Sequence, residues 1–103
     1  MAPLTRNQVF EIIGRLEAEI CALGVSRLAV FGSVARGEAR PDSDIDILVQ
    51  FSPGSKTFDR FLALSELLEA NLGRRIELIT TEALSPFIGS HILAEAQDVI
   101  RAA

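Results

Sequence analysis

The stretch FGSVARG, residues 31–37, is followed after a polar loop by SDIDILV, residues 43–49. The first stretch places a glycine–serine turn after an apolar run, and the second opens a strongly apolar strand with two aspartates. Successive side chains of a strand point to opposite faces, so Asp44 and Asp46 are expected on one face and the isoleucines on the other. Because two like charges on one face repel each other, the pattern indicates a divalent cation between them.

The glycine–serine turn is suited to an anion. Gly32 lets the backbone approach a phosphate closely, because it has no side chain. Residues 33–37 are predicted to form a short helical turn with Ser33 near its N-cap, where free backbone N–H groups and the hydroxyl can bind phosphate. Arg36 could bind a phosphate, or it could pair with Glu38 or with an aspartate of the site. Residues 31–49 thus predict a site for a nucleoside triphosphate and its metal.

A third carboxylate is expected on another strand. Residues 74–80 have the pattern of a strand in which Glu77 lies between apolar neighbours. A carboxylate in that position needs a partner. One of the two preceding arginines could supply it through a surface ion pair. Alternatively, Glu77 is a third metal ligand beside the two aspartates, and this is the interpretation we favour.

The remaining sequence alternates helices with strands. Thr5 and Gln8 form a capping-box signature at the start of a helix that is expected to run to Gly24. A second amphipathic helix, residues 57–72, lies between two strands, which should therefore be parallel. A last helix is expected from about Pro86 to Arg101, with an apolar stripe formed by Ile88, Ile92, Leu93, Ala96 and Ile100. These elements predict an α/β (α+β) fold, with a small three-stranded mixed sheet covered by helices in the order α-β-α-β-α-β-α.

Composition narrows the function classes. The chain of 103 residues is 49% hydrophobic, which suits one domain over residues 1–103. A net charge of −4 and the lack of Tyr and Trp argue against direct nucleic-acid binding. We expect no membrane segment and no targeting signal at the N-terminus, and hence a cytoplasmic protein. Cys21 is interpreted as a buried structural thiol, and His91 as a side chain without a ligand role.

The glycine–serine turn and the Asp-x-Asp strand resemble the nucleotidyltransferase superfamily of polymerase β type. Within it, the chain is similar to the minimal nucleotidyltransferases (MNT). The resemblance implies that Asp44, Asp46 and the third acidic residue, Glu77, hold two Mg²⁺ ions, with Mn²⁺ possible. The third acidic residue is usually Asp in that family, and Glu77 is one methylene longer. The resemblance also implies that Gly32 and Ser33, with Arg36, bind the triphosphate of ATP, and that Asp44, Asp46 and Ser33 are catalytic.

The resemblance further implies a partner, a small helical HEPN-type toxin for which the MNT chain is the antitoxin. Two functions follow. The chain could transfer AMP from ATP to a hydroxyl of that toxin, or it could neutralise the toxin by occlusion without catalysis. Nucleotidylation of a small molecule is a third alternative, which the lack of an acceptor-binding domain disfavours. A helix at residues 86–101 is the expected contact surface for the partner or for a homo-oligomer.

Overall fold

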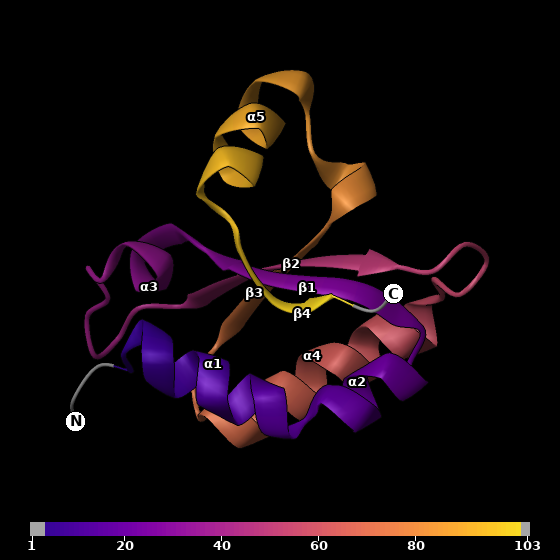
Figure 1. The fold of residues 1–103 in the computed structure, drawn as a ribbon, viewed down its shortest axis with the longest axis horizontal. Coiled ribbons are helices and arrows are strands. Elements are labelled where there is room, and N and C mark those ends of the chain that lie inside the picture. Colours follow the sequence, from indigo (N-terminus) through magenta and orange to yellow (C-terminus); the bar gives the residue numbers. More distant parts are fainter. Residues whose placement is uncertain (1–3, 102–103) are drawn as a thin grey trace.

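The computed structural model describes residues 4–101, and its centre is a four-stranded sheet. The strands are β1 (Val25–Phe31), β2 (Ile45–Phe51), β3 (Ile76–Thr80) and β4 (Gln97–Arg101), in the spatial order β3-β2-β1-β4 (Figure 1). β1 runs antiparallel to both β2 and β4, whereas β2 and β3 are parallel. The parallel pair is joined by α4 (Phe58–Leu72), as the strand–helix–strand pattern predicts. The α/β fold class is therefore confirmed.

One face of the sheet is covered by helices. α1 (Arg6–Arg15), α2 (Glu17–Ala22) and α4 lie together beneath it in Figure 1. The main core lies between these helices and the sheet, because every second residue of β2 points toward them. The fully or almost fully buried side chains of this core include Val9, Ile13, Ile20, Leu28, Val30, Ile45, Ile47, Val49, Leu64, Leu68 and Ile100. Within the described part of the chain, no helix is both long and apolar enough to cross a membrane.

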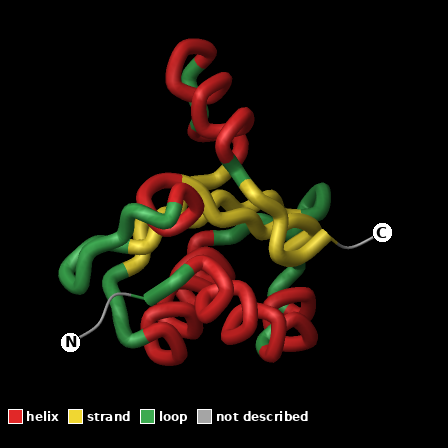
Figure 2. Tube along the Cα trace, turned by 60° about the vertical axis from the view of Figure 1, so that its left-hand side comes forward, coloured by secondary structure: helices red, strands yellow, loops and turns green. Residues whose placement is uncertain are grey.

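The opposite face of the sheet is only partly covered. A short 3₁₀ turn, η1 (Thr81–Ala83), and α5 (Pro86–Glu95) rise from it, and α5 projects well beyond the sheet (Figure 2). Beneath α5 lies a small second cluster of buried residues, formed by Ala29, Phe31 and Leu48. α3 (Gly32–Arg36) lies at one end of the sheet, between β1 and β2 (Figure 1). Near α3, this face carries the half-buried Asp46 and the exposed Glu77, so this part of it is open to solvent.

The N-terminal helix begins as predicted but ends earlier. The Thr5 hydroxyl accepts a hydrogen bond from the Gln8 N–H at 3.1 Å, and the Gln8 side chain accepts one from the Thr5 N–H at 2.9 Å. The expected single helix to Gly24 is interrupted at Leu16 (φ −96°, ψ 4°), where α1 ends and α2 begins. Gly14 weakens the helix just before this point, and Leu16 remains buried across the break.

The last predicted helix is wrong in its second half. α5 ends at Glu95, the backbone becomes extended at Ala96 (ψ 134°), and residues 97–101 form β4. The spacing of four residues between Ala96 and Ile100 also fits a helix, so the sequence pattern was misleading. The exposed edge of β1 would leave backbone N–H and C=O groups unpaired, and pairing with β4 satisfies them. The sheet therefore has four strands, not three, and Ile100 is buried from a strand.

Candidate functional site

The candidate site lies where the ends of three strands meet on the open face. Phe31, the last residue of β1, is the register partner of Asp46 on β2, and Asp46 is the register partner of Glu77 on β3. Ile45 and Ile47 are buried in the main core, so Asp46 points to the opposite face, as predicted. The two carboxylates therefore stand side by side on adjacent parallel strands.

Gly32 fits closely against one of these carboxylates. It follows Phe31 directly and has a positive φ of 73°, a conformation that other residues adopt only with strain. A Cβ at this position would overlap the Asp46 carboxylate. Both the backbone conformation and the close approach therefore require glycine, and Asp46 is held against the turn that leads into α3.

Asp46 is the most perturbed acidic group of the site. Its pKa is raised from 3.8 to about 6, first by burial, then by the hydrogen bond and the charge of Glu77, and then by the charge of Asp44. The positive charge of Arg36 acts in the opposite direction on this pKa. A charged group placed among like charges in a half-buried position is unfavourable for the empty fold, and it is a common mark of a functional site.

The third carboxylate, Asp44, is less closely associated. It precedes β2 and is exposed, and its effect on Asp46 is through charge alone. Among residues 4–101, no three acidic, histidine or cysteine side chains are placed to ligate one ion together. Even so, the donor set fits a divalent cation. Two facing carboxylates supply the oxygen ligands that Mg²⁺ prefers, and a cation would relieve the repulsion that raises the pKa of Asp46.

The groups that can donate hydrogen bonds to a phosphate lie in α3, whose first residue is Gly32. They are the Gly32 N–H, the Ser33 hydroxyl and the Arg36 guanidinium. Ser33, expected near the N-cap, is the second residue of this helix, because Phe31 is the cap. The Gly32 N–H donates to the Oε1 atom of Glu95 at 2.5 Å, and the Arg36 guanidinium donates to the same atom at 2.8 Å. Arg36 also pairs with Glu38 at 3.2 Å, one of the partners that the sequence suggests. The hydrogen bond to Glu38, followed by the charge of Glu95, raises the pKa of Arg36.

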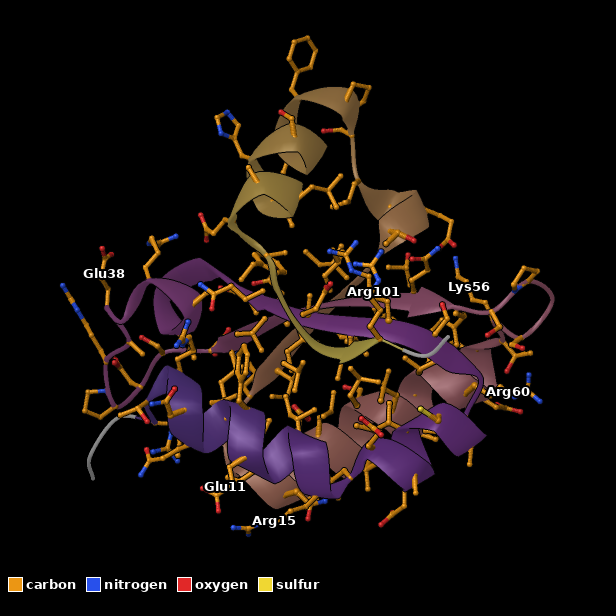
Figure 3. All side chains as sticks on the ribbon, in the orientation of Figure 1. Glu11, Arg15, Glu38, Lys56, Arg60 and Arg101 are labelled. Carbon is orange, nitrogen blue, oxygen red and sulfur yellow. The ribbon has the colours of Figure 1, made fainter. Side chains whose placement is uncertain are left out.

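Lys56, a cation near the sheet, lies away from the site. Lys56, in the turn after β2, pairs with Glu82 at 3.5 Å and lies at the opposite end of the sheet from Glu38 (Figure 3). His91 is exposed on α5. Sequence reasoning missed Glu95, because 63 residues separate it from Gly32 and no local pattern singles it out.

A family model described as "nucleotidyltransferase domain" matches residues 13–99, which include every part of this site. The chain belongs to the nucleotidyltransferase family. Members of this family use a nucleoside triphosphate and a divalent metal. The match confirms the resemblance that the glycine–serine turn and the Asp-x-Asp strand indicate.

Comparisons with individual proteins show which members of the family this chain resembles. The chain is 40% identical over 96 residues to the protein adenylyltransferase MntA of Thermococcus cleftensis, covering 92% of this chain and 96% of that protein. A solved structure of a protein assigned as a minimal nucleotidyltransferase has a TM-score of 0.77 and 37% identity, covering 91% of this chain and 95% of that one. The fold also matches, with a TM-score of 0.67, 15% identity and coverage of 95% and 74%, a structure of a tri-AMPylated Shewanella oneidensis HEPN toxin in complex with an MNT antitoxin.

Proposed function

We propose that this nucleotidyltransferase transfers AMP from ATP to a hydroxyl of a HEPN-type toxin and so acts as its antitoxin. The observation that carries the proposal is the pair of facing carboxylates, Asp46 and Glu77, held beside the Gly32 turn. A binding protein without catalysis has no use for this repulsive arrangement. The relative that shares 40% of its residues with this chain is named a protein adenylyltransferase, which supports AMP as the transferred group.

The residues of the site have separate roles in this proposal. Asp46 and Glu77, with Asp44 beside them, would hold two Mg²⁺ ions, or Mn²⁺ in their place. When bound, these ions neutralise charge on the phosphates and orient the reacting oxygens. The N–H groups at the start of α3, the Ser33 hydroxyl and Arg36 would bind the triphosphate, since N–H donors and a guanidinium are strong ligands of phosphate.

The reaction replaces one phosphorus–oxygen bond by another. The acceptor hydroxyl oxygen attacks the α-phosphorus of ATP and forms a phosphate ester. The bond from this phosphorus to the bridging oxygen breaks, pyrophosphate leaves, and the hydroxyl proton is released. This chain contains no tyrosine, so any tyrosine that becomes modified must belong to another protein. We further propose that residues 1–103 act as one domain, and that the use of ATP places it in the cytoplasm.

The proposal is tested with ATP labelled at the α-phosphate, Mg²⁺ and a HEPN-type toxin from the same organism. Label should appear on the toxin, and pyrophosphate should be released in equal amount. Asp44→Ala and Asp46→Ala should abolish labelling, and Ser33→Ala should weaken it. Asp42→Ala is the matched control, because it removes an exposed carboxylate from the loop next to the site and should leave labelling unchanged. No label on any partner protein would contradict the enzymatic function.

Occlusion without catalysis is the second candidate. The observation that favours it is α5, which projects from the sheet and leaves most of the Phe87 and Ile88 side chains exposed. Such a surface can bind a partner whether or not the site is active. The double variant Asp44→Ala/Asp46→Ala distinguishes the two functions. If it silences the toxin as well as the wild type does, and without ATP, the antitoxin acts by binding alone.

A further inference from the structure

One carboxylate holds two donors that the proposed function assigns to the triphosphate. The Oε1 atom of Glu95 accepts hydrogen bonds from the Gly32 N–H at 2.5 Å and from the Arg36 guanidinium at 2.8 Å. Glu95 is the last residue of α5 and comes from a segment remote in sequence. Its side chain is 31% exposed and that of Arg36 is 46% exposed, so the contact is accessible to a competing anion from solution.

Outside this contact, α5 is only lightly attached to the rest of the molecule. Among the residues of this helix, Gly89 alone is buried. The side chain of Ile92, together with Leu84 before the helix and Ala96 after it, rests on the small cluster of Ala29, Phe31 and Leu48. Few apolar contacts therefore oppose a movement of α5, and such lightly packed segments have a low free energy of local opening.

The strand that follows α5 is held separately. β4 pairs with β1 from Val30 and Gln97 to Arg27 and Arg101, and the Arg27 Nε donates to an Asp98 carboxylate oxygen at 2.6 Å. At the start of β4, the Gln97 side chain accepts from Arg6 at 2.6 Å. The extended residue Ala96 separates this anchored strand from the helix. α5 can therefore change its position while the sheet keeps all four strands.

We propose that Glu95 is an internal competitor of the triphosphate, and that binding of Mg·ATP displaces its carboxylate and releases the C-terminal end of α5. The inference rests on the proposed nucleotide site. The Gly32 N–H lies 2.5 Å, measured from N to O, from the Glu95 carboxylate, so its hydrogen is not available to a phosphate oxygen. The Glu95 carboxylate and the phosphate therefore exclude each other. Without nucleotide, the Glu95 carboxylate occupies the Gly32 N–H and the Arg36 guanidinium. A nucleotide must replace both charge-assisted contacts in order to bind. α5 is then released only while nucleotide is bound.

Affinity for nucleotide is the first test, measured by calorimetry with the full chain and Mg·ATP. Glu95→Gln keeps the size of the side chain and removes its charge, whereas Glu95→Ala removes the competitor. Both variants should bind Mg·ATP more tightly than the wild type, by about tenfold or more, because each change weakens or removes both contacts that the nucleotide must replace. Glu82→Gln is the matched control, because Glu82 also forms an exposed ion pair, with Lys56, but at the other end of the sheet. The affinity of the Glu82→Gln variant for Mg·ATP should equal that of the wild type.

Hydrogen exchange of residues 86–95 is the second test. In the wild type, Mg·AMP-PNP should speed exchange in α5 while it slows exchange around Gly32. In Glu95→Gln, exchange in α5 should already be fast without nucleotide. If the wild type binds Mg·ATP and both Glu95 variants bind it equally well or more weakly, Glu95 does not compete with the triphosphate and the inference is overturned. The proposed nucleotide site would still stand. If neither the wild type nor any variant binds Mg·ATP, the proposed function fails, and the inference fails with it.

Discussion

At the scale of single residues, Gly32 combines two constraints that can be separated by experiment. Its φ of 73° disfavours any side chain, and a Cβ would also overlap Asp46. Gly54 has a similar φ of 78°, but a Cβ there would meet only open space. Replacing either glycine by alanine costs about 1–2 kcal/mol for the left-handed backbone. Only the change at Gly32 should also displace the Asp46 carboxylate.

We therefore expect Gly32→Ala to lower the free energy of unfolding by more than Gly54→Ala does, and to abolish Mg·ATP binding. Gly54→Ala should keep wild-type affinity. Urea denaturation and calorimetry measure the two effects. Equal nucleotide affinity in both variants would show that the close fit between Gly32 and Asp46 has no part in binding.

The raised pKa of Asp46 leads to a second prediction at this scale. The folded-state pKa is about 6 against 3.8 for the ordinary carboxyl group, so the folded protein binds this proton more tightly than the unfolded chain does. The stabilising effect of protonation is complete below the unfolded pKa and is lost as the pH rises through about 6. In the absence of metal, Asp46→Asn should therefore stabilise the protein at neutral pH and lose this advantage near pH 4.

Urea denaturation of the metal-free protein across this pH range provides the measurement, with Asp42→Asn as the control for removing an exposed carboxylate. The difference in unfolding free energy between wild type and Asp46→Asn should shrink steadily as the pH is lowered. A constant difference at all pH values would mean that Asp46 titrates normally in the folded protein.

At the scale of elements, two residues near the end of the described chain test whether α5 is followed by the strand β4 or by a continued helix. Ile100 is buried from β4 in the main core, whereas Leu93 on α5 is 48% exposed. Ile100→Ala should lower the free energy of unfolding by about 2–5 kcal/mol, and Leu93→Ala by no more than about 0.5 kcal/mol. Chemical denaturation of the two variants checks the difference. Similar small losses in both would place residue 100 outside the core.

Local patterns account for what the sequence predicted correctly at this scale. The Thr5 and Gln8 capping box, the helix between the parallel strands, and the alternation around Asp46 each depend on residues a few positions apart. β4 could not be recognised in this way, because Ala96 and Ile100 fit both periodicities and only the open edge of β1 decides between them. Glu95 was also missed, because its partners Gly32 and Arg36 lie on a segment that is distant in sequence. The metal, phosphate and catalytic roles remain predictions.

At the scale of the whole molecule, two exposed phenylalanines lie on opposite sides of the sheet. Phe87 is 86% exposed in the first turn of α5, and Phe58 is 77% exposed in the first turn of α4. An aspartate is favourable in the first turn of a helix, so neither Phe87→Asp nor Phe58→Asp should harm folding. If the HEPN-type partner binds α5, only Phe87→Asp should weaken the complex, by about tenfold or more. Calorimetric titration with the partner measures this, and equal loss in both variants would exclude α5 as the specific contact.

The pairing of β1 with β4 also affects the order of events during protein synthesis. Arg27 and Asp98, which join these strands, are 71 residues apart along the chain. At translation rates of about 5–20 residues per second, β1 waits on the order of 4 to 14 s for its second neighbour to be made. During that interval, the edge of β1 is open to pairing with other chains. A newly made molecule is therefore most exposed to misassembly just before its last strand is complete, and rapid completion of β4 protects the supply of functional protein.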